Sequence, residues 1–314
     1  MKRLALCFLA WLGGAQLLPA VAAEIAAVVS QQAGVVTLID LGKDEVVSEI
    51  RLAKVPASIA AASDGRTLFV THPDLGMVSK VDVVTRNVTA TFKVGKEPFG
   101  VALVDKDRAL LITDWSDDAL IRVDAATGAE TGRTETGKSP AGLVVDDTRS
   151  LAYVADRESD QVSIIDTVTM KRIATITVGQ APFALALSPD GTRLYVGNVR
   201  SNDLSVIDTG ARKEIARVKV GLMPYGVAVT PDGTRVIVSN QQSGTLTVVN
   251  AETGNFVGRA RGGVFPEGVA VISGNRALMV DWAEDEVAVI DLAGMAITAR
   301  IHVGAGPRSV VVLR

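Results

Sequence analysis

A proline recurs along this chain at an almost constant interval, and two further residue series keep the same spacing. Successive prolines of the series are 42 residues apart, except for the last step of 41: Pro56, Pro98, Pro140, Pro182, Pro224, Pro266 and Pro307. The second series is Asp40, Asp82, Asp124, Asp166, Asp208, Asn250 and Asp291. The third is Ala53, Gly95, Gly137, Gly179, Gly221, Gly263 and Gly304. Three residue types in one register indicate seven copies of one supersecondary unit.

Each copy contains four short segments with the character of β-strands. In one copy, these segments are 183–187, 193–197, 204–208 and 215–220. The first two are joined by Ser-Pro-Asp-Gly at 188–191, a tight turn in which proline presets φ and glycine accepts a positive φ. Four antiparallel strands with a period near 42 residues make one propeller blade. The sequence therefore predicts an all-β fold, a seven-bladed β-propeller with four antiparallel strands per blade.

The two ends of the chain hold incomplete copies of the repeat. After Pro307 only one strand, 309–313, remains, whereas 25–52 supplies outer strands without an innermost one. We expect strand 309–313 to join the N-terminal strands 25–52 and so close the ring. A closed ring with charged outer strands needs no second copy, so we expect a monomer with a single domain over residues 23–314.

The first 22 residues read as a secretory signal peptide. Lys2 and Arg3 precede an apolar run, and Ala20-Val21-Ala22 provides a small-x-small cleavage signal. The run is too short for a membrane span, and no later segment approaches that length. We therefore expect a periplasmic or secreted protein that is not a membrane protein after cleavage.

Cysteine usage and charge exclude several classes of chemistry. The single cysteine, Cys7, lies in the expected signal peptide, so the mature chain would have no disulfide, catalytic thiolate, cysteine-bound metal or covalently attached c-type haem. The formal net charge is −3, which argues against nucleic acid as a partner. No metal site is predicted, because Asp117 and Asp118 offer too few oxygen ligands for Ca²⁺. No cofactor is predicted either.

One copy of the repeat carries a recognisable motif. It runs from Val178-Gly179 through Ser-Pro-Asp-Gly-Thr-Arg-Leu-Tyr-Val to Ser-Val-Ile-Asp208, with Tyr195-Val196-Gly197-Asn198 inside it. This motif resembles the YVTN-type propeller repeat, and the chain is similar to the exported, seven-bladed YncE-like proteins. The resemblance implies the fold and export. It implies little about a ligand, because the motif positions build turns and strands.

The loops after the second and fourth strands of each copy should open on the same face of a propeller. Ten residues before each member of the aspartate series, this face would carry Ser30, His72, Asp114, Asp156, Asn198, Asn240 and Asp281. The next position holds Gln31, Pro73, Trp115, Arg157, Val199, Gln241 and Trp282. Trp115 and Trp282 are thus equivalent residues, and tryptophan suits a contact surface. The alternative is that each indole packs against the neighbouring blade.

The residue that follows each proline of the series should lie where the chain enters the central channel. These residues are Ala57, Phe99, Ala141, Phe183, Tyr225, Glu267 and Arg308. Aromatic side chains beside a Glu–Arg pair are typical of a small-ligand pocket. The alternative is a channel plugged by these side chains. We predict a binding site formed by Trp115, Trp282, Phe99, Phe183, Tyr225, Asp114, Asp156, Asn198, Asn240 and Asp281.

Charge is distributed unequally between the two faces. On the predicted loop face, acidic residues outnumber the basic residues Arg157 and Arg200. The acidic residues are Asp74, Asp114, Asp117, Asp118, Asp156, Glu158, Asp160, Asp203, Asp281, Glu284 and Asp285. An acidic face would attract a cationic partner through its field. The alternative is ordinary loop charge that keeps the protein soluble.

Two functions of different classes remain open on these observations. We favour a non-catalytic exported propeller that binds a protein partner or a small ligand around the channel mouth. The alternative is a channel-mouth hydrolase or lyase, or an accessory subunit of a periplasmic oxidoreductase. The catalytic candidates for that alternative are His72, Glu267 and Arg308, since no zinc-type histidine cluster, phosphate-binding glycine loop or Ser-His-Asp pattern is present in the sequence.

Overall fold

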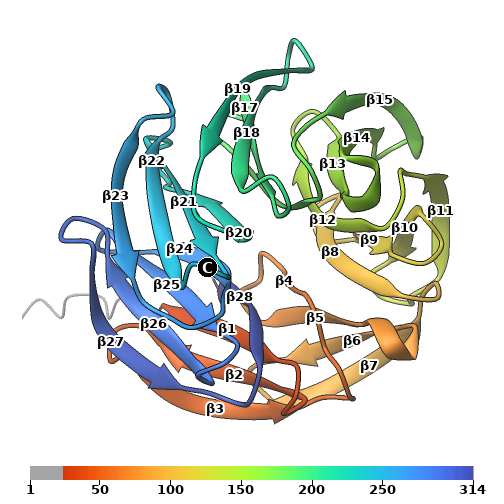
Figure 1. Ribbon diagram of the computed structural model, residues 1–314. Coiled ribbons are helices and arrows are strands. Elements are labelled where there is room, and N and C mark those ends of the chain that lie inside the picture. Colours follow the sequence, from red (N-terminus) through yellow and green to blue (C-terminus); the bar gives the residue numbers. More distant parts are fainter. Residues whose placement is uncertain (1–23, 314) are drawn as a thin grey trace, which may run out of the picture.

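The computed structural model describes residues 24–313 and forms a ring of seven four-stranded antiparallel sheets (Figure 1). The predicted all-β, seven-bladed propeller is thereby confirmed. The predicted signal peptide, residues 1–22, lies outside the described residues. We number the blades 1 to 7 in the chain order of their innermost strands.

The strands of blades 1 to 4 follow one another along the chain. Blade 1 contains β4 (Ile59–Ala61), β5 (Thr67–His72), β6 (Met77–Asp82) and β7 (Asn87–Lys93). Blade 2 contains β8 (Pro98–Val104), β9 (Ala109–Asp114), β10 (Ala119–Asp124) and β11 (Glu130–Glu135). Blade 3 contains β12 (Pro140–Asp146), β13 (Leu151–Asp156), β14 (Gln161–Asp166) and β15 (Lys171–Thr177). Blade 4 contains β16 (Pro182–Leu187), β17 (Arg193–Asn198), β18 (Asp203–Asp208) and β19 (Lys213–Lys219).

The remaining blades complete the ring, and two short 3₁₀ helices follow second strands. Blade 5 contains β20 (Pro224–Val229), β21 (Arg235–Asn240), β22 (Thr245–Asn250) and β23 (Phe256–Arg261). Blade 6 contains β24 (Pro266–Ile272), β25 (Arg276–Asp281), β26 (Glu286–Asp291) and β27 (Ala296–His302). Blade 7 contains β28 (Pro307–Leu313), β1 (Ile25–Ser30), β2 (Val35–Asp40) and β3 (Glu45–Arg51). The helices are η1 (Pro73–Leu75) and η2 (Arg157–Ser159).

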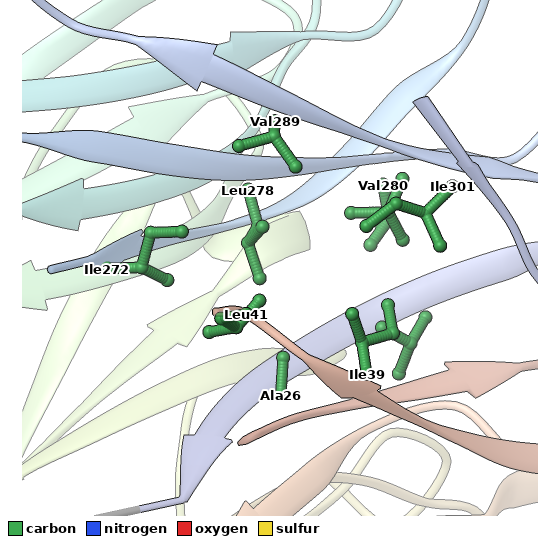
Figure 2. Packing of buried hydrophobic residues seen from close by; sticks show 10 residues of the cluster. Ala26, Ile39, Leu41, Ile272, Leu278, Val280, Val289 and Ile301 are labelled. Atoms are coloured by element: carbon green, nitrogen blue, oxygen red, sulfur yellow. The ribbon is translucent and has the colours of Figure 1, made fainter. Parts of the chain in front are cut away.

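The ring closes by pairing the C-terminal strand with the N-terminal strands, as predicted. Strand β28 is the innermost strand of blade 7 and runs antiparallel to β1, with Val310 opposite Val28. A buried hydrophobic cluster joins this blade to blade 6, with Ile39 and Leu41 on one side and Leu278 and Val280 on the other (Figure 2). Burial of such side chains contributes roughly 1.5–3 kcal/mol each.

The innermost strands approach one another so closely that glycine is required in them. A Cβ added to Gly142 would lie 2.5 Å from the carbonyl oxygen of Phe183 in the next blade. A Cβ added to Gly226 would likewise lie 2.5 Å from the carbonyl oxygen of Glu267. A larger side chain at either position would push two blades apart, so these glycines set the width of the channel.

The repeated aspartates build turns rather than a site. The Asp82 carboxylate accepts hydrogen bonds from the backbone N–H groups of Val84 at 2.9 Å and Thr85 at 2.8 Å. The asparagine of the series, Asn250, accepts the same bonds from Glu252 and Thr253. These Asx turns start the connection from the third to the fourth strand of a blade.

Candidate ligand-binding channel mouth

One end of the channel opens into a cavity of about 400 Å³, which we call the mouth cavity. Its walls come from innermost strands, from loops after second strands and from loops after fourth strands, so both loop sets open on one face, here called the mouth face. The lining residues are Gln31, Val55, Pro73, Asp74, Glu97, Phe99, Trp115, Arg157, Phe183, Tyr225 and Arg308. Four predicted binding residues and one catalytic candidate, Arg308, therefore meet here.

Three aromatic side chains, Phe99, Phe183 and Tyr225, form a collar between the mouth cavity and the channel below it. The ring centroids of Phe99 and Phe183 are 5.6 Å apart, and those of Phe183 and Tyr225 are 4.3 Å apart. Trp115 extends this chain, with its ring 5.4 Å from that of Phe99. The collar residues line both the mouth cavity and the channel cavity of about 310 Å³. The collar therefore forms the boundary between the two cavities.

Blade 3 leaves room for the collar, because it has alanine where blades 2 and 4 have phenylalanine. Ala141 is fully buried and follows the proline that begins β12. Its small side chain allows Phe99 and Phe183 to touch across the blade between them. An edge-to-face pair of this kind stabilises by about 0.5–1.5 kcal/mol beyond burial alone.

Arg308 and Glu267 form an ion pair beside the collar, as the sequence suggested. Arg308 Nε lies 3.1 Å from Glu267 Oε2, and Gln241 Nε2 donates to Glu267 Oε1 at 2.9 Å. The guanidinium of Arg308 also lies 5.7 Å from the centre of the Phe99 ring. Burial raises the pKa of the Glu267 carboxyl more than Arg308 lowers it. Burial, with a smaller contribution from Glu267, also raises the pKa of Tyr225.

A second arginine, Arg157 in η2, covers the outer side of the mouth cavity. Its guanidinium lies 5.7 Å from the centre of the Trp115 ring and is ion-paired with Glu158. Arg200 holds the same Glu158 carboxylate from the next blade at 2.9 and 2.8 Å. The repeat register predicts that Arg157 lies on the mouth face, but the predicted binding site does not include it. The available signal was its repeat position, which is the one that holds Trp115 in blade 2.

Five predicted binding residues lie beneath the mouth face rather than on it. Their side chains share one repeat position and are fully buried: Asp114, Asp156, Asn198, Asn240 and Asp281. The Asp114 carboxylate accepts the backbone N–H of Lys96 at 2.7 Å, and that of Asp281 accepts the N–H of Val264 at 2.5 Å. Asn240 accepts the N–H of Gly221 at 2.8 Å. Asp114, Asn240 and Asp281 thereby hold the loop that leads from the preceding blade into their own blade, and we call the five residues the loop clamps.

His72 is a loop clamp as well. Its side chain is fully buried, with Nδ1 3.1 Å from the carbonyl oxygen of Lys54 and Nε2 2.9 Å from Ser79 Oγ. Burial lowers the pKa of His72, so the neutral ring is favoured. Among the described residues that line the mouth cavity, His72 is absent. His302 is exposed at the end of the outer strand β27.

The two equivalent tryptophans differ in their surroundings. Trp115 lines the mouth cavity, whereas the half-buried Trp282 is absent from that lining. Trp282 lies against blade 7, where a Cβ added to Gly306 would be 3.2 Å from its indole Nε1. From the sequence alone, each of the two tryptophans could form a contact surface or pack against the neighbouring blade. The geometry supports contact for Trp115 and packing for Trp282.

Part of the acidic charge on the mouth face is paired with basic side chains. Asp117 is bonded to Lys96 and lies 3.6 Å from Arg133, while the buried Asp203 lies 3.2 Å from Lys219. The mouth cavity itself holds Asp74 and Glu97 together with the two arginines. Its lining is therefore mixed in charge, and the attraction of a cationic partner stays a prediction.

Residues 24–313 contain no group of three or more histidine, cysteine, aspartate or glutamate side chains placed to hold a metal ion. Within the same residues, no helix has the length and apolar character that a membrane crossing requires.

Comparison with known proteins adds a family match over part of the chain. The family described as Cytochrome D1 heme domain matches residues 146–261, less than half of the chain. A search of curated proteins finds no significant match. The matched segment carries Arg157, Phe183 and Tyr225 of the mouth cavity.

Solved structures share the architecture at low sequence identity. A functionally unknown protein from Desulfotomaculum acetoxidans has a TM-score of 0.81 at 15% identity, covering 93% of this chain and 99% of that one. Hydrazine synthase from Kuenenia stuttgartiensis has a TM-score of 0.74 at 20% identity, covering 82% and 95%. The dihydro-heme d1 dehydrogenase NirN, in complex with DHE, has a TM-score of 0.68 at 17% identity, covering 88% and 63%. These likenesses establish the class, a β-propeller, and the YVTN-type repeat stays a prediction.

Proposed function

We propose that this protein binds a small ligand with a flat, apolar body in the mouth cavity, without catalysing a reaction on it. One observation carries the proposal: Trp115, Phe99, Phe183 and Tyr225 meet at one cavity of about 400 Å³. An apolar pocket with few convergent polar groups is the usual form of a small-molecule site. Stacking on the collar would hold the flat body, and Arg157 with Arg308 would orient a polar substituent.

Two matched probes test this proposal and the sign of the ligand charge. Naphthalene carboxylate and naphthylmethylamine share a flat ring and differ in charge. Titration calorimetry should detect binding of at least one of them, and Phe183→Ala should weaken that binding about thirtyfold. Equal affinity of the wild-type protein and the Phe183→Ala variant for both probes would contradict the proposal. If a probe binds as expected, mass spectrometry of the exported protein would identify its natural ligand.

A second candidate function is the carriage of a tetrapyrrole ring for a redox enzyme. The observation that favours it is the family match over residues 146–261, which contains Phe183 and Tyr225, two of the three collar residues. One structural neighbour, NirN, is by name a dehydrogenase of dihydro-heme d1. A tetrapyrrole is flat and carries carboxylates, which suits the aromatic collar and the two arginines.

The lining fits the ring of such a group but not axial ligation of its iron by this chain. Within the described residues, no histidine, cysteine or methionine lines the mouth cavity, and both nitrogens of His72 are engaged. Tyr225 does line it, but burial raises the pKa of its hydroxyl and so disfavours the phenolate that ligates iron. Iron protoporphyrin and iron-free protoporphyrin should therefore bind with equal affinity. Tighter binding of the iron form by tenfold or more would show a ligand that this geometry lacks.

The enzymatic alternative depends on Glu267 and Arg308. A buried carboxyl with a raised pKa beside an arginine is a common feature of general acids and bases. We expect the Glu267→Gln substitution to change ligand affinity. Any catalytic turnover that the wild-type protein shows should persist in this variant. Loss of a measured activity in Glu267→Gln, with ligand affinity retained, would favour the enzyme.

We further propose that the chain is exported and works as one domain over residues 23–314. Support comes from the Lys2-Arg3 start, the following apolar run and the Ala20-Val21-Ala22 motif. N-terminal sequencing of the secreted protein should give a start at or near Ala23. A mature protein that still begins at Met1 would contradict export by this signal.

A further inference from the structure

The loop clamps are of two kinds, which differ in the residue seven positions further along the chain. In blades 2 and 6 that residue is apolar, Ile121 or Ala288, and the clamp aspartate uses both carboxylate oxygens for backbone N–H groups of the loop. In blades 1, 3, 4 and 5 it is a serine or threonine whose hydroxyl is hydrogen-bonded to the clamp, at 2.9, 2.6, 2.8 and 2.9 Å. In these four blades, a hydroxyl at this position is accompanied by a clamp that reaches it.

Blade 7 has the hydroxyl, but the side chain at its clamp position is too short to reach it. Ser30 occupies the clamp position, and Thr37 lies seven residues later. Val35 is opposite Ser30 in the pairing of β1 with β2, so Thr37, two residues further along β2, lies on the same face of the sheet. Both side chains are fully buried, and neither hydroxyl has a hydrogen-bond partner among residues 24–313. A buried hydroxyl without a partner is costly, because it loses its hydration without compensation.

The loop over Ser30 does not move in to fill the space that the short side chain leaves. Blade 5 is the matched reference, because its hydroxyl is also that of a threonine, Thr247. A Cβ added to Gly304, the glycine of the repeat in the blade 7 loop, would lie 3.1 Å from Ser30 Cβ. A Cβ added to the equivalent Gly221 would lie 2.6 Å from Asn240 Cβ. The loop therefore lies no closer to the serine than it does to the longer asparagine.

The blade 7 loop also supplies a third polar group. In blade 5 the Gly221 N–H donates to Asn240 Oδ1 at 2.8 Å. The equivalent N–H in blade 7 is that of Gly304, and it donates to no group within residues 24–313, whereas the Gly306 N–H of the same loop donates to Asp285. Two hydroxyls and one N–H therefore meet where blade 5 has a clamp amide. A buried water molecule typically makes about three hydrogen bonds to groups of this kind.

We propose that blade 7 binds one buried water molecule through Ser30 Oγ, Thr37 Oγ1 and the Gly304 N–H, in the place that the amide of Asn240 takes in blade 5. All three groups are uncharged and one of them is an N–H, which cannot ligate a cation, so the site suits water rather than an ion. Ser30 and Thr37 lie on β1 and β2, whereas Gly304 precedes the last strand, β28. The water therefore links the two ends of the chain beside the pairing of β1 with β28, independently of any ligand in the mouth cavity.

The Thr37→Val substitution tests the water through the sign of its effect on stability. With the water bound, the substitution removes one of its partners, and the melting temperature should fall by roughly 2 °C. If the two hydroxyls have no partner at all, valine removes an unsatisfied polar group, so the melting temperature stays constant or rises, and that result would overturn the proposal. Thr247→Val in blade 5 is the matched control. It breaks a direct hydrogen bond at the equivalent position and should lower the melting temperature in either case.

A high-resolution crystal structure of the wild-type protein tests the site directly and needs no variant to fold. We expect an ordered water molecule about 3 Å from both Ser30 Oγ and Thr37 Oγ1. A direct hydrogen bond between the two hydroxyls, or no density between them, would overturn the proposal. In a crystal structure of the Ser30→Asn variant the water should be gone, because the amide of the longer side chain would reach Thr37 as Asn240 reaches Thr247. Water that stays in place beside this amide would contradict the equivalence of the two blades.

Discussion

The two ends of the channel are built from the same seven strands and have different linings. The mouth end has the aromatic collar, two arginines and the buried Glu267. The opposite end opens into a cavity of about 980 Å³ lined mainly by alanine, valine, leucine and proline. Its polar side chains within the described residues are Ser63 and Asp107, and these are bonded to each other. The mouth end therefore presents aromatic and charged side chains, whereas the lining of the opposite end is mainly aliphatic.

The difference follows from how strictly each end keeps the repeat. Five residues after each proline of the series, the far end has aliphatic residues throughout: Ala61, Leu103, Val145, Leu187, Val229, Val271 and Val312. One residue after each proline, the mouth end varies between alanine, phenylalanine, tyrosine, glutamate and arginine. The repeated positions build the ring, and the positions that depart from the repeat are the ones that could recognise a ligand.

Removing the last strand should destroy both ends at once, the largest effect expected. Strand β28 supplies Arg308 to the mouth and Val310–Val312 to the far end. A chain that stops at Gly306 would expose the edge of β1 and the inner side of its hydrophobic cluster. We expect no cooperative thermal transition by circular dichroism. A native-like melting curve for this truncation would contradict closure of the ring by β28.

Substitutions at the two ends should separate binding from stability. Phe183→Ala removes the centre of the collar and should weaken binding of the naphthalene probe about thirtyfold, since about 2 kcal/mol of stacking and burial is lost. Leu187→Ala, at the far end of the same strand, should lower the denaturation midpoint and leave affinity unchanged. Equal losses of affinity in both variants would mean that the ends are not distinct. Calorimetry and denaturation of each variant provide the measurement.

The equivalent tryptophans give a finer test within the mouth face. Trp115→Ala should weaken probe binding about fivefold to tenfold, because about 1 kcal/mol of aromatic contact in the mouth cavity is lost. Trp282→Ala should leave affinity within about twofold and lower the melting temperature instead, since its indole packs against blade 7. The reverse pattern would place the ligand at Trp282.

The smallest expected effect is an acid response of the mouth face through His72. Burial lowers the pKa of its ring, so stability is fully present above the unfolded pKa of about 6.5 and is lost as the pH falls towards the folded pKa. His72→Asn should flatten this part of the pH profile. Hydrogen exchange should show the loss in the loop around Lys54 rather than at the far end. An unchanged profile in the variant would mean that another group is responsible.

The fold could be predicted almost completely from the sequence, because the spacing of three residue types fixes the number of blades and the closure by 309–313. The collar could also be predicted, since a residue that follows a strand-opening proline must lie at the channel entrance. The ring position that begins with Ser30 was harder to interpret. Repeat register gives a residue its place along a strand but not whether its side chain faces a loop backbone or solvent.

Arg157 and Asp156 both show that the repeat register does not predict the surroundings of a side chain. The position of Arg157 was known from the register, but its stacking on Trp115 depends on the turn of η2, which the repeat does not encode. Asp156 was expected on the surface, and it is buried because the loop 137–139 covers it. Contacts between blades decide both cases, and one copy of the repeat read alone contains no information about its neighbours.

The position of Arg308 on β28 has a consequence for the order of steps in folding. The other residues that line the mouth cavity lie earlier in the chain, between Gln31 and Tyr225. A chain whose synthesis has not reached β28 lacks Arg308 and cannot form the complete mouth cavity. The cavity is complete only once β28 has paired with β1, so its formation also reports closure of the ring.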